Sequence, residues 1–171
     1  MAIKGNIKLN SLDSSQLINA IESFSVSLNL NIETINALNV FPVPDGDTGT
    51  NMYLSVKYIL ENLEEKDNEK QINLLAKDIA KLSLLGARGN SGLILSQFFK
   101  GLSQSLENKN TLDSISFAQC LDYATKNAYD SLPNPVEGTM VTVFRECADQ
   151  AKLEIDKNSN LLELVSNVTK T

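Results

Sequence analysis

The chain has 171 residues, of which 42% are hydrophobic, so it is long and apolar enough to bury one sizeable core, and this excludes global disorder. Its formal net charge is -6 with the acidic residues spread along the chain, which argues against a general nucleic-acid binder because no basic stripe can neutralise phosphates. Histidine is absent, so Ser-His-Asp and Cys-His catalysis and histidine-ligated metal sites are excluded. Any metal ion must be held mainly by oxygen.

The sequence has neither a signal core nor a membrane span. Residues 1–16 lack an apolar stretch, and no window approaches the roughly 18 uninterrupted apolar residues of a membrane helix. Cys120 and Cys147 lie among apolar residues with helical spacing, which favours buried free thiols over a disulfide or a metal pair. We therefore expect a cytoplasmic protein with no transmembrane segment.

Helical periodicity predominates in the first half of the chain. The first helix is indicated by apolar residues at Leu17, Ile21, Phe24 and Leu28. Ser14 and Ser15 precede it and would supply an N-cap. Two antiparallel helices are then expected from the sets Met52, Val56, Ile59, Leu60, Leu63 and Ile72, Leu75, Ile79, Leu82. The charged residues 64–70 between them predict a solvated connection.

The second half continues the pattern, and no strand alternation is apparent. Three more helices are indicated by the sets Ile94, Phe98, Leu102; Ala118, Leu121, Thr125, Ala128; and Met140, Val143, Phe144, Cys147, Ala151. A last set, residues 161–168, is still in phase near Thr171 without a glycine cap or proline stop. We expect one all-α domain over residues 1–171, with its last helix cut short, as the N-terminal fragment of a longer protein.

Three irregular segments, residues 39–50, 86–92 and 132–139, hold most of the glycine and proline. Each leads directly into a predicted helix. Helix N-termini carry unpaired N–H groups and the positive end of the helix dipole, both of which favour an anion. The three segments would form a phosphate site if they converge in space.

The first segment contains two carboxylates, Asp45 and Asp47, on either side of Gly46. Pro42 and Pro44 hold the backbone extended and prevent a helix before Asp45. A glycine between them would let both carboxylates turn toward one point, and Mg²⁺ prefers such oxygen ligands beside phosphates. The alternative is a turn followed by a helix cap, which Asp-Gly sequences often provide. The tripeptide alone leaves both interpretations open.

The second and third segments are also ambiguous when taken singly. Residues 86–92 offer small residues, a hydroxyl group and free amides at a helix start, but they match neither the Walker pattern nor a dinucleotide fingerprint. A helix–helix turn is the alternative, and Arg88 would either neutralise phosphate or pair with a surface carboxylate. In the third segment Thr139 stands at an N-cap position.

Together the three segments resemble one family. The string from Asn36 to Met52, NALNVFPVPDGDTGTNM, is highly specific, and the likeness spans nearly the whole chain. The chain is identified as similar to the N-terminal nucleotide-binding domain of bacterial fatty-acid kinase, within the superfamily of the dihydroxyacetone kinase nucleotide-binding subunit. The resemblance implies a closed, up-and-down antiparallel helical barrel or bundle of about eight helices.

The resemblance also implies a site. In that family an Asp-Gly-Asp loop binds two Mg²⁺ ions, a Gly-Ser-Gly-type turn binds phosphates, and a Thr-Met pair lies near the nucleotide. The implied catalytic and metal-binding residues are Asp45 and Asp47, with Asn39 as a third metal ligand. The implied residues for ATP or ADP are Thr48, Thr50, Asn51, Arg88, Gly89, Asn90, Ser91, Gly92, Thr139 and Met140. For the adenine, the candidates are Leu93, Ile94 and Met140.

The implied function is an ATP-dependent kinase. Thr48 stands where the dihydroxyacetone branch has histidine, which favours the fatty-acid branch. There the acceptor is a fatty acid presented by a separate binding protein, and the product is an acyl phosphate. An isolated domain would bind nucleotide without completing the reaction. A dihydroxyacetone kinase subunit and a non-catalytic helical interaction module remain the alternatives, and a homodimer remains open.

Overall fold

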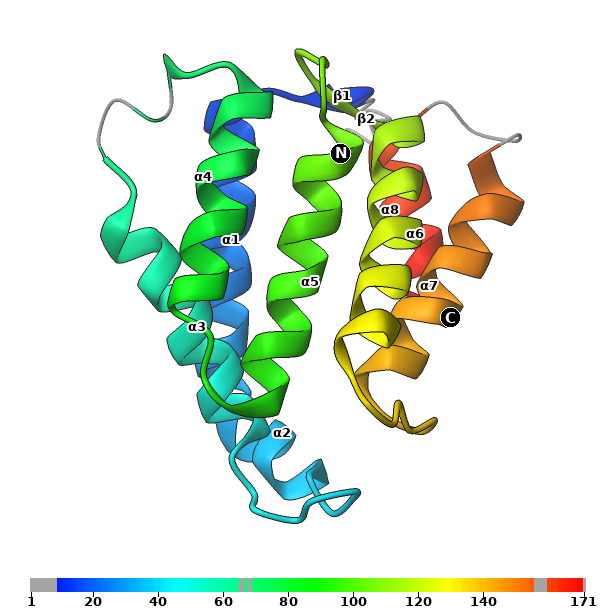
Figure 1. Cartoon of the computed structure of the whole chain (residues 1–171). Coiled ribbons are helices and arrows are strands. Elements are labelled where there is room, and N and C mark those ends of the chain that lie inside the picture. The colour runs from blue at the N-terminus through cyan, green and yellow to red at the C-terminus, as the bar shows by residue number, and fades with distance from the viewer. Residues whose placement is uncertain (1–8, 65–66, 68, 156–159, 171) are drawn as a thin grey trace, which may run out of the picture.

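The structure, a computed structural model, describes residues 9–64, 67, 69–155 and 160–170. The described residues form eight α-helices and two very short strands (Figure 1). The helices are α1 (Ser14–Leu30), α2 (Ile32–Leu38), α3 (Thr48–Asn62), α4 (Ile72–Leu85), α5 (Gly89–Ser105), α6 (Ser114–Ser131), α7 (Met140–Ile155) and α8 (Leu161–Val168). The strands β1 (Ser11–Leu12) and β2 (Leu112–Asp113) pair antiparallel.

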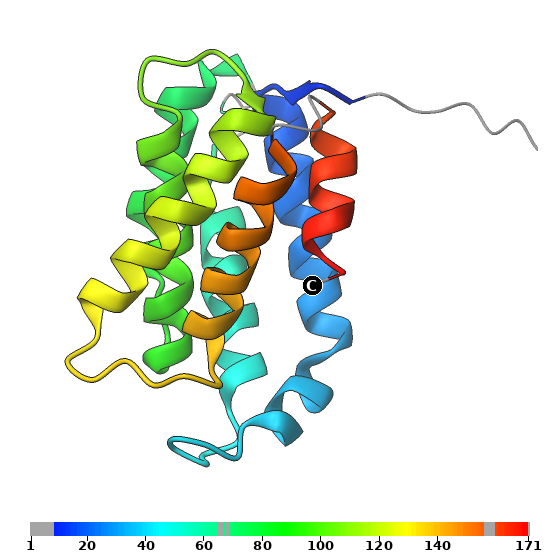
Figure 2. The ribbon, with the colours of Figure 1, turned by 90° about the vertical axis from the view of Figure 1, so that its right-hand side faces the viewer.

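The long helices alternate in direction from α3 to α7, as Figures 1 and 2 show. Helix α5 lies at the centre and packs most extensively against α6 and α4, with further contacts to α3. Helix α1 covers α3 on one side, and α7 and α8 pack against α6 on the other. The all-α bundle of up-and-down helices is therefore confirmed.

The periodic apolar residues form the core. The largest cluster joins α1, α3, α4 and α5, and its fully buried members include Val56, Ile59, Leu75 and Ile79. A second cluster joins α6, α7 and α8 around Leu164. These residues recur every three or four positions, so each helix presents one apolar face to its neighbours. This is the reason that helical periodicity predicted the long helices.

Three local features differ from the prediction. Helix α1 is capped by Asp13, whose carboxylate accepts the Gln16 N–H at 2.9 Å in a reciprocal capping box, so the expected serine cap is wrong. Ser14 is instead the first helical residue, and its hydroxyl donates to the Lys70 carbonyl at 2.6 Å. Helix α2 and the two strands were not predicted. They are short, and α2 has no buried residue to produce a periodic signal.

The charged connection after α3 is not uniformly solvated. Asp67 is only 3% exposed, and the Lys70 Nζ lies 2.6 Å from its carboxylate and 2.8 Å from that of Asp78. Hydrogen bonds to Asp67 and Asp78 raise the pKa of Lys70 above its usual range. Residues 65, 66 and 68 of this predicted connection lie outside the described residues. Ion pairs of Lys70 therefore tie part of this segment to Asp78 of α4.

The structure bears on two further expectations, which concern membrane-spanning helices and the two cysteines. None of the helices in the described parts of the chain is long and apolar enough to cross a membrane. Both cysteines are free thiols; Cys120 is buried and Cys147 is half-buried. Burial raises the pKa of both thiols, which makes them poor nucleophiles.

Candidate functional site

The three glycine- and proline-rich segments lie at one end of the bundle. The connections that precede α3, α5 and α7 all lie at the lower end in Figures 1 and 2. Each leads into a helix, at Thr48, Gly89 and Met140 respectively, although α3 and α5 begin inside the segments 39–50 and 86–92 that were predicted to be irregular. The segments are separated in sequence, yet the fold gathers them in one region.

The starts of α3 and α5 are in direct contact. The Ser91 hydroxyl approaches the Thr48 carbonyl at 3.5 Å, and the Arg88 N–H donates to the Ser55 hydroxyl at 3.0 Å. Gly89 has a positive φ of 56°, and a Cβ at this position would lie 2.5 Å from the Asn51 Nδ2. A larger residue would be strained at this φ and would require the Asn51 side chain to move. The first two predicted segments therefore form one continuous site.

Helix α3 is capped from outside its own first turn. The Asn36 Oδ1 accepts the Gly49 N–H at 2.8 Å and the Thr50 N–H at 3.2 Å, while its Nδ2 donates to the Thr50 hydroxyl at 3.0 Å. The first-turn amides that would otherwise attract an anion are thus engaged by Asn36. The start of α3 therefore offers side chains to a ligand rather than these two amides.

The two carboxylates of the first segment have no partner in the part of the chain that the structure describes. Asp47 is the N-cap residue of α3, yet its side chain makes no capping hydrogen bond. Within the described residues, neither the Asp45 nor the Asp47 carboxylate forms a hydrogen bond or an ion pair, and Asp45 is exposed. Gly46 between them has a φ of 66°, the left-handed region that favours glycine. The helix-cap interpretation therefore does not describe the Asp47 side chain.

Asn39 braces the loop that carries these carboxylates. Its Oδ1 accepts the Asp47 N–H at 3.2 Å, and its Nδ2 donates to the Val43 carbonyl at 2.9 Å. Among the described residues, no group of three or more histidine, cysteine, aspartate or glutamate side chains can hold a metal ion. A magnesium ion bound at Asp45 and Asp47 would need further oxygen ligands, such as phosphate oxygens and water.

The start of α5 differs from that of α3. Its N-cap residue, Arg88, makes no side-chain capping hydrogen bond, and no other side chain among the described residues caps its first-turn amides. Arg88, Gly89 and Asn90 are exposed, whereas Ser91 and Gly92 are buried. The first three predicted phosphate-binding residues of this segment are therefore accessible to a ligand, and the last two pack into the protein.

The third segment is held by a network centred on Glu137. The hydroxyl groups of Tyr129 and Thr142 and the guanidinium group of Arg145 all donate to its carboxylate, Thr142 at 2.7 Å and Arg145 at 3.2 Å. These bonds, the one from Tyr129 first, lower the pKa of Glu137 from 4.5 to about 2. The Gly138 N–H donates in turn to the Thr142 hydroxyl at 2.8 Å. The network ties the loop to α6 and α7.

Thr139 and Met140 follow this network at the start of α7. The Thr139 hydroxyl donates to the Val136 carbonyl at 2.7 Å, and its own carbonyl accepts the Thr142 N–H at 3.0 Å. Met140 is half-buried and packs beside the cluster of Ile94 and Val141. Ile94 is thus a core residue, and Met140 is the more accessible apolar candidate at this end.

Sequence reasoning missed three residues that organise this end. Asn36 lies within the diagnostic string, but its partners are 13 and 14 residues away, so no local pattern indicates its capping role. Ser55 resembles any other helical serine, although it is buried between α3 and the α5 start. Glu137 precedes Thr142 by five residues and Arg145 by eight. These two partners are therefore three residues apart, about one helical turn. Only that last spacing offers a usable signal.

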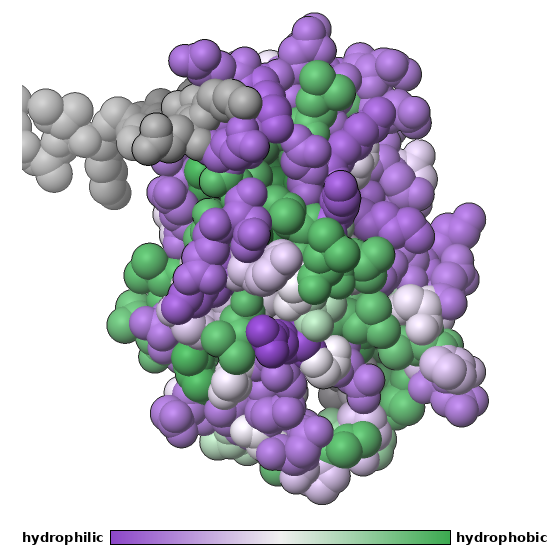
Figure 3. Space-filling view, turned by 60° about the vertical axis from the view of Figure 1, so that its left-hand side comes forward, coloured by the Kyte–Doolittle hydropathy of each residue, from purple (hydrophilic) through white to green (hydrophobic). Residues whose placement is uncertain are grey.

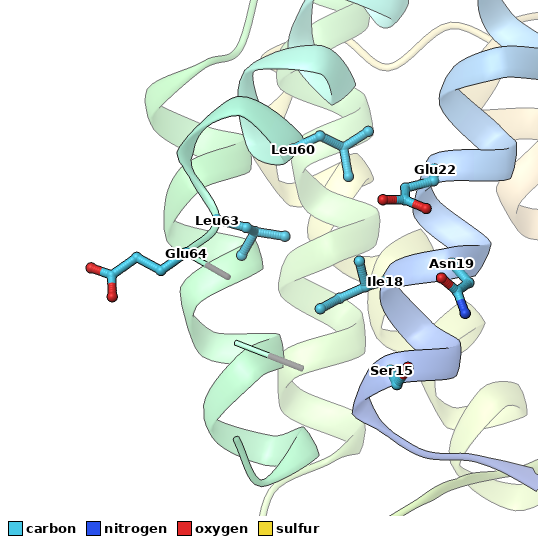
Figure 4. Close-up of a pocket in the computed structure, with 7 residues that line it drawn as sticks. All are labelled: Ser15, Ile18, Asn19, Glu22, Leu60, Leu63 and Glu64. Atoms are coloured by element: carbon cyan, nitrogen blue, oxygen red, sulfur yellow. The ribbon is translucent and has the colours of Figure 1, made fainter. Parts of the chain in front are cut away.

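The bundle also has a small cleft at its other end. It has a volume of about 310 Å³ and lies between the first half of α1 and the end of α3, with Ile18, Leu60 and Leu63 among its lining residues (Figure 4). Glu22 points into this cleft, while the Glu64 side chain points away from it. None of the predicted site residues lines it. The cleft is therefore separate from the site described above.

An all-α bundle with these segments at one end is the architecture expected of a dihydroxyacetone kinase-like domain. The model of the DAK2 domain matches residues 42–171, and the chain belongs to this kinase-related family. The predicted family is thereby confirmed. Protein YloV of Bacillus subtilis (strain 168) is 38% identical over 163 residues, which cover 95% of this chain and 29% of YloV.

A second relative has a similar identity and a similar coverage. An uncharacterized protein of Staphylococcus saprophyticus is 42% identical over 142 residues, which cover 83% of this chain and 26% of that protein. The chain thus spans less than a third of the length of both relatives. The activity, substrate and partners of a whole protein of this kind are therefore matters for proposal.

Proposed function

We propose that this domain binds Mg·ATP or Mg·ADP and serves a kinase by holding the nucleotide for phosphoryl transfer. The observation that carries the proposal is the absence of a structural role for two carboxylates. Asn36 takes over the capping of α3, and the carboxylates of Asp45 and Asp47, on either side of Gly46 in the sequence, have no partner among the described residues. Aspartates that the fold does not use, next to an uncapped helix start, suit a metal–phosphate ligand.

In this proposal the two helix starts have different tasks. Asp45 and Asp47 hold the metal, and phosphate oxygens and water complete its ligands. Bound Mg²⁺ would neutralise charge that develops on the phosphate oxygens. The α5 start binds the phosphates through the amides of residues 89–91 and the hydroxyl group of Ser91, and Arg88 supplies a positive charge. The chain's contribution to catalysis is positioning and charge neutralisation.

The remaining predicted residues complete the nucleotide site. Thr48, Thr50 and Asn51 belong to the first turn of α3, and Gly92 packs against Ser55 beneath the α5 start. Thr139 and Met140 approach from the α7 start, where Met140 and the half-buried Leu93 offer apolar surface for the adenine. This assignment extends the family resemblance to the residues that the bundle gathers at one end.

We further propose a fatty acid, delivered by a separate binding protein, as the phosphoryl acceptor. Thr48 in place of the histidine of the dihydroxyacetone branch supports this choice. A partner also suits the exposed apolar side chains of Leu38, Val40, Phe41 and Val43, just before Asp45. A dihydroxyacetone kinase subunit is the second candidate, and it would phosphorylate a small ketone instead.

Isothermal titration calorimetry with Mg·ATP tests the nucleotide site. We expect binding by the unchanged domain and a loss of at least about 100-fold in affinity for Asp45→Ala and Asp47→Ala, because each removes a charged metal ligand. Asp122→Ala is the matched control, since this exposed aspartate pairs only with Lys152 at the α6–α7 surface. Unchanged affinity in both site variants would refute the metal assignment. No binding by the unchanged domain would favour a helical interaction module.

A further inference from the structure

We propose that Asn39 is a positioning residue, which holds the Asp45–Asp47 loop in its binding geometry before any metal arrives, and that it is not a metal ligand. The role assigned to the loop rests on the proposed function. The brace itself is a property of the folded chain. It replaces the expectation that Asn39 completes the metal site as a third ligand.

Hydrogen-bond chemistry fixes the orientation of the Asn39 carboxamide. The Asp47 N–H can only donate, so the atom 3.2 Å from it must be the carboxamide oxygen. The Val43 carbonyl can only accept, so the atom 2.9 Å from it must be the carboxamide nitrogen. Both ends of the side chain are therefore engaged, and exchanging oxygen and nitrogen would break both bonds.

These two bonds close the loop across its base. Val43 and Asp47 flank Pro44, Asp45 and Gly46, so one side chain spans the whole Asp-Gly segment. Gly46 has broad conformational freedom, and an unbraced loop would have to lose that freedom when the metal binds. Asn36 fixes the adjoining α3 start in the same way. The two asparagines thus preorganise the carboxylates from one short helix, α2, and its C-cap.

The substitution Asn39→Asp distinguishes a positioning role of Asn39 from a role as metal ligand. A carboxylate keeps an acceptor for the Asp47 N–H but loses the donor to Val43, whose carbonyl would then face a negatively charged oxygen. A ligand role predicts that Asn39→Asp keeps or strengthens Mg²⁺ binding, because a carboxylate is the better ligand. A brace predicts weaker binding, even though the added charge attracts the cation.

The first measurement is the affinity for Mg·ATP by calorimetry. We expect Asn39→Asp and Asn39→Ala both to weaken it, by roughly 5- to 10-fold, the loss typical of one or two supporting hydrogen bonds. Asn62→Ala is the control, because the exposed Asn62 carboxamide makes one bond, to the Tyr58 carbonyl, at the other end of α3. Retained or tighter binding by Asn39→Asp would overturn the brace.

The second measurement is amide hydrogen exchange of residues 43–47 in the metal-free, nucleotide-free protein. We expect faster exchange across this loop in both Asn39 variants than in the unchanged protein or Asn62→Ala, with α4 and α5 unaffected. Equal exchange in all four proteins would overturn the brace. Because this measurement needs no ligand, it tests Asn39 even if Asp45→Ala and Asp47→Ala show that the proposed metal site is wrong.

Discussion

The Asn36 side chain makes three hydrogen bonds at the start of α3. It accepts two first-turn amides of α3 and donates to the Thr50 hydroxyl. We expect Asn36→Ala to lower the free energy of unfolding by about 1–2 kcal/mol, the usual cost of a lost N-cap. Urea denaturation monitored by circular dichroism measures this. Asn36→Asp keeps the acceptor and should cost less, and equal stabilities of all three proteins would contradict the capping role.

Glu137 should remain ionised in unusually acidic solution. Its pKa is lowered from 4.5 to about 2, so the network contributes fully above pH 4.5 and is lost as the pH falls through about 2. At pH 3 a group with this pKa is still about nine-tenths ionised, whereas an ordinary glutamate is almost fully protonated. We expect the carboxyl carbon chemical shift of Glu137, followed by NMR from pH 7 to 3, to remain nearly constant.

The neighbouring groups provide the control for that titration. The exposed Glu33 in the first turn of α2 lies outside this network, so its signal provides the comparison. The amide of Gly138, which reports on the Thr142 hydroxyl, should also keep its shift over the same range. A midpoint near 4.5 for Glu137 would show that the three donors do not hold its carboxylate in solution.

At the scale of elements, Ser55 couples α3 to the α5 start. Its hydroxyl donates to the Asn51 carbonyl at 2.7 Å and accepts the Arg88 N–H at 3.0 Å, and the side chain is buried. We expect Ser55→Ala to destabilise the fold by about 1–2 kcal/mol, since the Arg88 amide loses its acceptor. Ser23→Ala is matched, because Ser23 makes the same bond to the carbonyl four residues back but is exposed. Equal urea midpoints for the two variants would contradict the coupling.

The elements also explain what could be predicted from the sequence. Helices such as α4 and α5 have many buried apolar positions, so periodicity identified them. Helix α2 has none, and the paired strands have two residues each, so tertiary contacts rather than local patterns define them. The same holds at the site. Asp45 and Asp47 were recognised by residue type, but the roles of Asn36 and Asn39 depend on where the chain returns in space.

At the scale of the whole molecule, topology explains why three distant segments meet. In an up-and-down bundle every second connection lies at the same end. The connections before α3, α5 and α7 are such alternate connections, and the C-terminal ends of α3, α5 and α7 lie toward the opposite end of the bundle (Figure 1). Convergence at one end therefore follows from helix order alone. The hydrogen bonds between α3 and α5 then fix the distances.

The surface beside the site has an unusual composition for an exposed loop. Val40 and Phe41 are 73% and 56% exposed, and the neighbouring Leu38 and Val43 are exposed as well. Figure 3 shows apolar side chains breaking the hydrophilic surface on the α3–α4 side of the molecule. Exposed apolar surface next to a candidate phosphate site is more consistent with a binding role than with a solvated loop.

That surface gives a prediction that separates binding of nucleotide from recognition of the acceptor. Val40→Ser and Phe41→Ser remove exposed apolar area, so we expect the melting temperature and the affinity for Mg·ATP to stay unchanged. In a longer protein that carries this domain, the proposed formation of acyl phosphate with a fatty-acid-binding partner should fall about 10-fold or more, because a hot-spot side chain typically contributes more than 1 kcal/mol. Lys57→Ser, in an exposed i, i+4 pair with Glu61 on α3, is the control. Unchanged turnover in both apolar variants would place the partner elsewhere on the molecule.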